Sequence, residues 1–393
     1  MMQNIFSDRI AGVPRSFIRE ILKVANDGSV ISFAGGLPNR NLFPVEELKA
    51  ATNKLFDEAG KDILQYSESE GYLGLREWIA SRYKEKKGIN INPQNILITT
   101  GSQQALDLLG KIFLNEEDNV ILEKPGYLGA IQAFSVYKPR FIQIPLESYG
   151  INLDILEKTV EKHSIKLFYC VPNFQNPSGI TYSTENRSKI ADILELKQTI
   201  LVEDDPYGEL RFWGEDKPSF YKFLPEKTVL LGSFSKTVVP SFRVGWIVAN
   251  DDIMDKMVVA KQASDLHTNY FGQRIIHQYL QDNDIDQHIV KIREAYGQQR
   301  DAMVKAIEEY FPQGITYTKP EGGMFLWVTL PEGLSALKVF EQAIKNKVAF
   351  VPGDPFYIGE KNVNTMRLNF SCADEDTIRT GIERLGRILK DMI

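Results

Sequence analysis

The stretch LGSFSKTVVPSFRVGW, residues 231–246, places Lys236 directly after two alternating serines and seven residues before Arg243. Ser233 and Ser235 point to one side of an extended segment, and an arginine can bind phosphate through two parallel hydrogen bonds. The set predicts a phosphate site, and a structural loop with a chance arginine explains it equally well. A lysine is not needed for that phosphate, and most lysines only extend into solvent. Lys236 is therefore a candidate nucleophile if the rest of the chain supplies the other groups of a reaction site.

The chain on either side of this stretch alternates between two kinds of segment. Amphipathic segments with 3.6-residue spacing at 102–114 and 185–197 predict helices, and short runs rich in β-branched residues predict strands. The predicted strands are NILITT (95–100), NVILE (119–123), KLFYCVP (166–172), TILVEDD (199–205), TVLLGSF (228–234) and RVGWIVA (243–249). This order predicts an α/β fold with a mostly parallel sheet that is covered on both faces and binds ligands beyond the carboxyl ends of its strands.

The C-terminal third has a different pattern. A long polar helix is predicted at about 285–310, and a final helix at 375–392. Between them lie GGMFLWVTL (322–330), a further helix, VAFVPG (348–353) and TMRLNFS (365–371). This mixture predicts a second, smaller α+β domain.

Composition excludes several classes of partner. The chain has 393 residues, of which 43% are hydrophobic and 25% charged, as is typical of a soluble globular protein. Its formal net charge is −6 and it has no dense Lys/Arg tract, so we expect no nucleic-acid partner. No apolar run reaches the roughly 18 residues that a membrane span needs, and the N-terminus does not resemble a secretory signal. We therefore expect a cytoplasmic protein without a membrane partner.

The cysteines and histidines give no sign of a disulfide framework or a metal site. Cys170 and Cys372 are the two cysteines of the chain, and we expect both to be reduced, buried thiols. The four histidines have no metal-ligand spacing, although His267 and His277 can still meet in space. We therefore predict no metal.

Polar residues follow several of the predicted strands. Ser102 and Gln103 start the helix after the first strand, where free amides and the helix dipole favour an anion, although an ordinary helix cap is the simpler explanation. Asp204 ends the strand TILVEDD, where a buried carboxylate needs a cation or water. Tyr207 lies three residues further on, so both side chains can meet one ligand, and an acidic surface loop explains the pair as well.

Two more residues suit a ligand. Asn176 lies in the turn of CVPNFQNPSGI at the end of another strand. Arg367 lies inside the apolar strand TMRLNFS, where a guanidinium needs a carboxylate, either from the protein or from a substrate. Together the chain offers a phosphate site, a lysine, an acid, a phenol, an amide and an arginine. Pyridoxal 5′-phosphate (PLP) uses all of them, because it has a phosphate, an aldehyde, a pyridine nitrogen and a 3-hydroxyl.

In these motifs the chain resembles the fold-type I PLP enzymes. Within them it is similar to the class I/II aminotransferases of the 2-aminoadipate and kynurenine aminotransferase branch, to which the aminotransferase domain of MocR regulators is related. The resemblance runs through ISFAGGLPNRNLFP, QYSESEGYLGLREWIA, TTGSQQALDL, KPGYLGA, PNFQNPSG, EDDPYGEL, GSFSKTVVPSFRVGW, GGMFLW, VPGDPFY and MRLNFS, in that order.

The resemblance implies a large domain, residues 46–284, with a mostly parallel seven-stranded sheet, and a small α+β domain formed by residues 1–45 and 285–393. It makes Lys236 the Schiff-base lysine, which also moves a proton between the substrate α-carbon and cofactor C4′. Asp204 would pair with the pyridine nitrogen. The remaining cofactor contacts it implies are Asn176 and Tyr207 at the 3-oxygen, Tyr127 on the ring, and Ser102, Gln103, Ser233, Ser235 and Arg243 at the phosphate.

For the substrate, the resemblance implies that Arg367 binds the α-carboxylate, with Gly36 and Asn176 nearby. It also implies a homodimer with shared active sites, in which Tyr66 reaches the phosphate of the neighbouring subunit. The expected reaction is a ping-pong transamination that moves the amino group of an L-amino acid to a 2-oxo acid. The amino donor is left open.

Two alternatives stay open on the same motifs. A PLP lyase, decarboxylase or racemase would use the same cofactor residues, although Arg367 favours chemistry that retains the α-carboxylate. A MocR-type regulator would carry a winged helix before the domain, and FAGGLP begins here at residue 33. Arg40 is a possible contact for a distal substrate carboxylate, a solvated arginine being the simpler explanation. The roles of Arg15 and Arg19 are left open.

Overall fold

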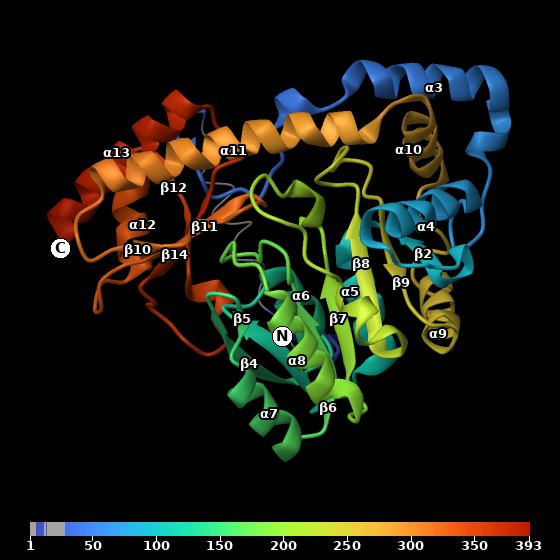
Figure 1. The fold of residues 1–393 in the computed structure, drawn as a ribbon, viewed down its shortest axis with the longest axis horizontal. Coiled ribbons are helices and arrows are strands. Elements are labelled where there is room, and N and C mark those ends of the chain that lie inside the picture. Colours follow the sequence, from blue (N-terminus) through green and yellow to red (C-terminus); the bar gives the residue numbers. More distant parts are fainter. Residues whose placement is uncertain (1–4, 12, 14–27) are drawn as a thin grey trace.

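Helices and strands alternate through most of the computed structural model, which describes residues 5–11, 13 and 28–393 (Figure 1). Arg15 and Arg19 lie outside the described residues. The α-helices are α1 (Asp8–Ala11), α3 (Val45–Ala59), α4 (Leu73–Lys87), α5 (Gly101–Phe113), α6 (Leu128–Ser135), α7 (Leu153–Lys162), α8 (Thr184–Glu195), α9 (Asp251–Gln262), α10 (Tyr270–Asp282), α11 (Ile285–Tyr310), α12 (Ala336–Lys345) and α13 (Glu375–Met392).

The main sheet has the mostly parallel architecture that the sequence predicts. Its strands, in spatial order, are β2 (Ile96–Thr99), β9 (Gly245–Val248), β8 (Thr228–Ser233), β7 (Ile200–Asp204), β6 (Ile165–Cys170), β3 (Asn119–Lys124), β4 (Arg140–Glu147) and β5 (Gly150–Ile151). From β8 to β4 each neighbouring pair is parallel, whereas β9 runs antiparallel to both its neighbours. The first seven strands match the expected seven-stranded sheet, and the two-residue β5 adds an antiparallel edge to β4.

Both faces of this sheet are covered, because successive buried residues of a strand point to opposite sides. In β6, Leu167 and Tyr169 belong to the hydrophobic core that includes helices α5, α6 and α9, whereas Phe168 and Cys170 belong to the core beneath α7 and α8. Helices α4 and α10 cover the far end of that second face, over β2 and β9. Near-continuous apolar strands are what a doubly covered parallel sheet requires.

A second sheet lies at the other side of the molecule. Its order is β10 (Thr316–Tyr317), β11 (Phe325–Thr329), β14 (Thr365–Asn369) and β13 (Val351–Pro352), all antiparallel. Strand β1 (Ile31–Ser32) pairs with β12 (Val348–Ala349), so the segment near residue 31 joins this C-terminal part. Helix α11 extends from beside α10 to a long contact with α13 and so spans both parts of the molecule (Figure 1).

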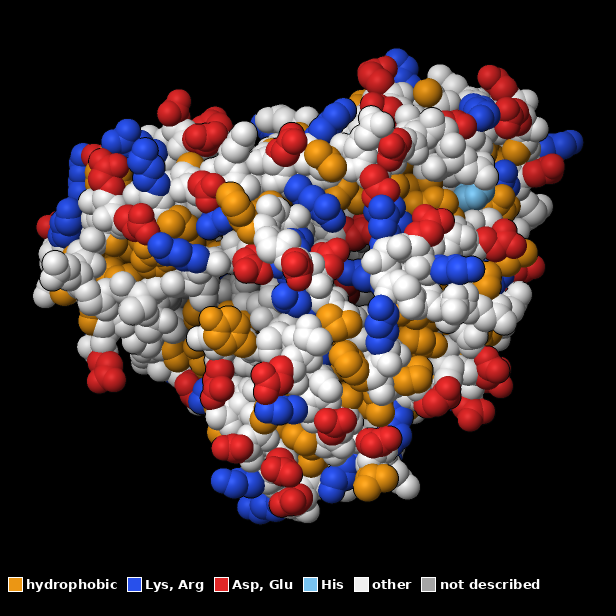
Figure 2. Space-filling view, in the orientation of Figure 1, with side chains coloured by type: hydrophobic (Ala, Val, Ile, Leu, Met, Phe, Trp, Pro, Cys, Tyr) orange, Lys and Arg blue, Asp and Glu red, His pale blue; other side chains and the backbone are white. Residues whose placement is uncertain are grey.

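The surface agrees with the charge balance of the sequence. On the face shown in Figure 2, Lys and Arg side chains are interspersed with Asp and Glu. Within residues 5–11, 13 and 28–393, no helix combines the length and the apolar character of a membrane span.

One expectation about the cysteines is wrong. Cys170 is buried in β6 as predicted, but Cys372 is exposed, because it lies in the turn between β14 and α13 rather than in the buried strand. Both thiols are free.

Candidate active site

A cavity of about 260 Å³ opens where the carboxyl ends of the parallel strands meet. Its lining contains every site residue predicted from the sequence except Tyr66. The lining residues are Gly36, Ser102, Gln103, Tyr127, Val171, Asn176, Asp204, Pro206, Tyr207, Ser233, Ser235, Lys236, Arg243, Phe325 and Arg367.

The sheet topology explains why residues so far apart in sequence meet here. Asp204 ends β7 and Ser233 ends β8, while Asn176 and Tyr127 follow β6 and β3 within a few residues. Strand β2 is antiparallel to β9, as β8 is, so the start of α5 after β2 lies at the same edge. Ligands of doubly wound sheets bind at this edge. From the second sheet, β11 and β14 add Phe325 and Arg367.

Lys236 projects from the turn after β8 into the cavity. Its Nζ donates a hydrogen bond of 2.7 Å to the carbonyl oxygen of Gly36. Burial lowers the pKa of Lys236 from 10.5 to about 8, and the charges of Arg367 and Arg243 act in the same direction. About a tenth of the amine is therefore unprotonated at pH 7, far more than at the ordinary pKa, and the unprotonated form is the one that acts as a nucleophile or a base.

Asp204 is a buried acid with one oxygen free. Its side chain is 1% exposed, and Oδ2 accepts a hydrogen bond of 2.7 Å from the hydroxyl of Tyr169. Burial raises the pKa of Asp204 from 3.8 to about 7, although the bond from Tyr169 acts to lower it. Oδ1 is buried without a hydrogen-bond partner among the described residues. A cationic donor in the cavity would satisfy this oxygen and favour the ionised form.

The start of α5 forms one end of the cavity. Helix α5 has no side-chain cap, and the Oγ of Ser102 is buried without a hydrogen-bond partner among the described residues. Gly101 has a φ of +70°, and a Cβ at this position would lie 2.5 Å from Nη2 of Arg243. Glycine therefore lets the guanidinium pack against the first turn of the helix. Uncapped amides, a hydroxyl and a cation form an anion site.

Two serines complete this end. The Oγ of Ser233 donates a hydrogen bond of 2.9 Å to the Oγ of Ser235, so the two side chains point to the same side as the alternation predicts. Both serines are 8% exposed and line the cavity with Arg243. The hydroxyls lie within one group of donors that suits a phosphate.

Arg367 forms the opposite end of the cavity. It is 3% exposed, its Nη1 donates to Oδ1 of Asn176 at 2.8 Å, and its Nη2 donates to the carbonyl oxygen of Ala34 at 2.7 Å. Its guanidinium carbon lies 4.3 Å from the ring centroid of Phe325. Burial lowers the pKa of Arg367 from 12.5 to about 10. These hydrogen bonds reach an amide and a carbonyl instead of a carboxylate, which favours a ligand as the source of the negative charge.

Asn176 connects this end to a phenol. Its Nδ2 donates a hydrogen bond of 3.3 Å to the hydroxyl of Tyr207, while its Oδ1 accepts the bond from Arg367. Burial raises the pKa of Tyr207 above its usual value, and burial also raises the pKa of Tyr127 to about 12. Both phenols are therefore protonated donors in the physiological pH range.

The chemistry of the free donors and acceptors tests whether PLP fits. Within the cavity lining, three buried polar atoms lack a partner among the described residues, namely Ser102 Oγ, Asp204 Oδ1 and Arg367 Nε. All three belong to the lining of the same cavity. A phosphate, a protonated ring nitrogen and a substrate carboxylate would satisfy them in that order, so the residues fit the cofactor and an amino acid.

Two residues named in the sequence analysis lie elsewhere. Tyr66 is 79% exposed, and its ring lies edge-on to His267 at 5.8 Å, outside the lining of the cavity. Arg40 is also exposed and does not line the cavity. The role of Tyr66 toward a neighbouring subunit stays a prediction.

The structure adds residues that the motifs did not indicate. Tyr169 is fully buried, donates to Asp204 and stacks at 6.4 Å from Tyr127. Glu123 lies at the end of β3, where it accepts hydrogen bonds from Gln175, next to Asn176, and from the hydroxyl of Tyr182. Burial raises the pKa of Glu123 to about 8. A polar residue inside an apolar strand was the sequence signal in both cases.

Several known proteins are similar to this chain in sequence and in fold. The family profile described as Aminotransferase class I and II matches residues 30–385. The aromatic-amino-acid aminotransferase 1 of Thermococcus litoralis is 42% identical over 395 residues, which cover 99% of this chain and 95% of that protein. The 2-aminoadipate transaminase of Thermus thermophilus is 40% identical over 385 residues, covering 97% of this chain and 95% of the relative.

A solved structure is equally similar. The kynurenine aminotransferase of Pyrococcus horikoshii, crystallised in complex with PMP, is 42% identical with a TM-score of 0.95, covering 100% of this chain and 98% of that chain. Helix-turn-helix transcriptional regulators of Bacillus subtilis are more distant, at 28% to 29% identity over 75% to 78% of their own length.

Proposed function

Because the chain belongs to the family of class I and II aminotransferases, we propose that the cavity around Lys236 is the active site of a PLP-dependent aminotransferase. The observation that carries the proposal is the meeting, in one cavity, of an amine with a lowered pKa, a buried acid and a buried arginine with free polar atoms. The enzyme moves an amino group from an amino acid to a 2-oxo acid, and its cofactor is PLP.

The proposed cofactor contacts follow the geometry of the cavity. When bound, PLP supplies a protonated ring that stabilises the negative charge left on the substrate after an α-proton is removed. Asp204 would hold the proton of the ring nitrogen, and Asn176 and Tyr207 would orient the 3-oxygen. Tyr127 would lie against the ring. The phosphate would be bound by Ser102, Gln103, Ser233, Ser235 and Arg243.

Lys236 and Arg367 would divide the work on the substrate. Arg367 would bind the α-carboxylate and so fix which bond of the α-carbon lies above the ring. Lys236 would hold the cofactor between turnovers. Once free, its amine would move a proton between the substrate α-carbon and C4′ of the cofactor. The lowered pKa of Lys236 suits a base that works near neutral pH.

The relatives indicate which donors to test first. We propose aromatic amino acids, kynurenine and 2-aminoadipate, the substrates in the names of the most similar proteins. The test is to add each donor to the PLP-bound enzyme, follow the loss of the absorbance of the lysine-bound cofactor, and then add 2-oxoglutarate to restore it. Release of carbon dioxide, or a racemised amino acid without amino transfer, would favour a decarboxylase or a racemase instead.

Replacing Arg367 tests the carboxylate contact. Arg367→Lys is expected to lower kcat/KM for the amino donor by about 10²–10³-fold, because lysine cannot form the paired hydrogen bonds of a buried guanidinium. The measurement is the rate of the first half-reaction against donor concentration. An amine that lacks the α-carboxylate serves as the control, and its rate should change less than about threefold. Equal losses for both compounds would mean that Arg367 supports the packing of the site and does not bind the α-carboxylate.

The pH dependence of cofactor binding tests Lys236. Covalent capture of PLP by the cofactor-free protein is expected to accelerate about tenfold per pH unit up to pH 8 and then level off. The rate rises with pH because only the unprotonated amine reacts. The pKa of Lys236 is lowered to about 8, which leaves about a tenth of the amine unprotonated at pH 7. Stopped-flow absorbance measures the rate. A rate that keeps rising to pH 10 would mean that the amine titrates at its ordinary pKa of 10.5.

We propose a homodimer with shared active sites, because Tyr66 is 79% exposed and lies outside the cavity of its own chain. The phenol would then reach the phosphate site of the partner.

We also propose residues 46–284 as the large domain and residues 1–45 with 285–393 as the small domain, since α10 ends at Asp282 and α11 begins at Ile285. A cytoplasmic location is proposed in line with the two free thiols.

A further inference from the structure

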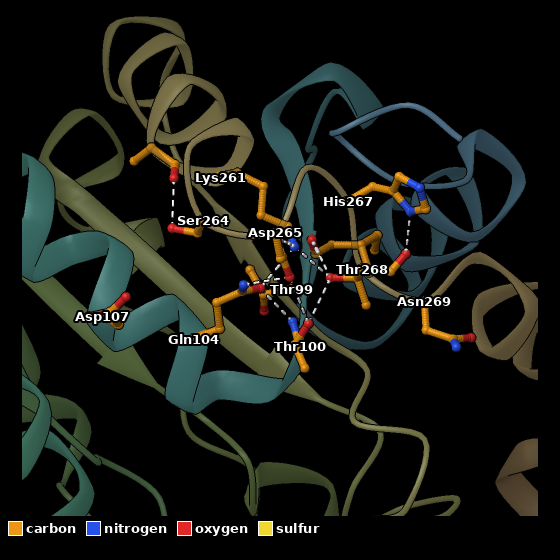
Figure 3. Close-up of polar contacts among 12 residues, drawn as sticks. Thr99, Thr100, Gln104, Asp107, Lys261, Ser264, Asp265, His267, Thr268 and Asn269 are labelled. Atoms are coloured by element: carbon orange, nitrogen blue, oxygen red, sulfur yellow. Dashed lines mark hydrogen bonds and ion pairs between the residues drawn. The ribbon is translucent and has the colours of Figure 1, made fainter. Parts of the chain in front are cut away.

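A fully buried lysine lies behind the first turn of α5, on the last turn of α9. Lys261 is 0% exposed, and its ammonium uses all three of its protons in hydrogen bonds (Figure 3). They reach Asp265 Oδ1 at 2.5 Å, Gln104 Oε1 at 2.9 Å and Thr268 Oγ1 at 2.9 Å. Lys261 does not line the cavity, and the proposed reaction gives it no role.

Asp265 connects Lys261 to the start of α5 through further hydrogen bonds. Its Oδ2 accepts hydrogen bonds from Gln104 Nε2 at 2.7 Å and from the hydroxyl of Thr100 at 3.2 Å. Gln104 Oε1 also accepts the backbone N–H of Thr100 at 2.8 Å. We call Lys261, Asp265, Gln104, Thr100 and Thr268 the Lys261 cluster. Every polar atom of the Gln104 side chain is bound within it.

The Lys261 cluster holds the turn that precedes α5 from both sides. Thr268 Oγ1 donates to the carbonyl oxygen of Ile98 in β2 at 3.3 Å, while Thr100 and Gln104 flank Gly101, Ser102 and Gln103. Gly101, at a φ of +70°, has no side chain of its own to restrict this turn. Side-chain contacts around the glycine therefore help to set the conformation of the turn, and the cluster supplies several of them.

Gln104 Oε1 satisfies the N–H of Thr100, the residue before the helix, but no contact of the cluster reaches the amides of residues 101–103. The side chain of Thr100 gives its hydrogen to Asp265, and α5 has no side-chain acceptor at its first-turn amides. Ser102 Oγ is likewise buried without a partner among the described residues. The Lys261 cluster thus fixes the turn and leaves its donors available to an anion.

Lys261 is buried but Asp265 is 32% exposed, and an ion pair that takes a charge out of water is weak support for stability, because apolar side chains of similar volume often replace such a pair without loss. Burial acts to raise the pKa of Asp265, but hydrogen bonds from Lys261 and Gln104 outweigh it, so the pKa lies below its usual value and the carboxylate is charged. A charged pair with this many directed bonds restricts geometry more than an apolar contact does.

We propose that the Lys261 cluster positions the phosphate-binding turn at residues 100–104, so that its loss weakens the binding of the cofactor's phosphate but not of its ring. This rests on the proposed function, in which Ser102 and Gln103 bind the phosphate. Lys261 and Asp265 are positioning residues, since neither lines the cavity.

The test compares PLP with pyridoxal, which has the same ring and aldehyde but no phosphate. Both are titrated into the cofactor-free protein and followed by absorbance. Lys261→Met fills the same space without a charge, and Asp265, whose side chain is 32% exposed, can turn to water. The Kd of PLP is expected to rise about 10–100-fold in this variant, while that of pyridoxal changes less than about threefold.

The chain offers a matched control on the same helix. Lys111 in α5 binds Asp107 and Ser264, both at 2.7 Å, and so also ties α5 to the segment after α9, away from the first turn. Lys111→Met should leave both Kd values within about twofold. If Lys261→Met weakens PLP and pyridoxal equally, or weakens neither, the positioning role is wrong.

Two further variants allow the experiment to contradict the proposal even if Lys261→Met does not fold. If Lys261→Met does not fold, Asp265→Asn replaces it, with the same selective loss of PLP affinity expected and circular dichroism confirming the fold. Ser102→Ala tests the phosphate site itself. If Ser102→Ala lowers PLP affinity and Lys261→Met does not, the inference alone fails, whereas a wild-type protein that binds PLP no tighter than pyridoxal contradicts the proposed function.

Discussion

Replacing Lys236 with alanine is expected to lower kcat by at least about 10³–10⁴-fold, because the variant loses both its covalent hold on the cofactor and its base. Lys236 is the lysine that lines the cavity, and its pKa of about 8 makes it reactive near neutral pH. A second readout does not depend on turnover. After borohydride reduction and denaturation, the cofactor should stay attached to the wild-type chain and be released from the Lys236→Ala variant.

An exposed lysine provides the control for this experiment. Lys319 bonds Glu308 at 2.6 Å on the surface and lies outside the cavity, so Lys319→Ala should keep full activity and full covalent retention. Cofactor that remains covalently attached to the Lys236→Ala chain would show that another lysine holds it. Loss of PLP binding in both variants would point to a general change in the fold.

The fold was predictable because strand and helix patterns were strong where the site is built. All six strands named from the sequence are present, and the long helix predicted at 285–310 is α11. The strands are mostly apolar, and two neighbouring parallel strands end in the polar residues Asp204 and Ser233. Since parallel strands end at one edge, polar residues at the ends of several strands predict one shared site.

Other parts of the fold carried weaker signals. Strand β4 mixes exposed and buried residues and β5 has two residues, so neither shows the pattern of a core strand. The expected burial of Cys372 was also wrong, because the chain has already left β14 and turned at this residue. Boundaries of this kind depend on tertiary contacts.

The contacts that the neighbours of the site residues make could not be read from the sequence. Tyr169 lies 35 positions before Asp204 and reaches it only because β6 and β7 pair in parallel. Lys261 contacts Gln104, which lies 157 positions away. Arg367 was left open between a protein carboxylate and a ligand, and its observed partners, Asn176 and the carbonyl of Ala34, favour a ligand. Contacts at such separation are set by the fold.

Asp204→Asn is expected to lower kcat by about 10²–10³-fold while the variant still binds PLP. Asparagine keeps the size of the side chain and can still accept the hydrogen bond from Tyr169, but it carries no charge to hold a proton on the ring nitrogen. A neutral ring accepts less negative charge from the α-carbon, so removal of the α-proton becomes slower. The loss should therefore fall on kcat and on exchange of the α-proton with deuterated water, with KM little changed.

The adjacent carboxylate, Asp205, provides a matched control for Asp204→Asn. Asp205 is not part of the cavity lining and accepts a hydrogen bond of 2.8 Å from Asn173, so Asp205→Asn makes the same chemical change one residue further along the chain. We expect it to lower kcat less than about tenfold, because its charge does not face the ring nitrogen. Full turnover in Asp204→Asn would remove this acid from the mechanism. Equal losses in the two variants would mean that the net charge of the region matters and that no specific pairing with the ring exists.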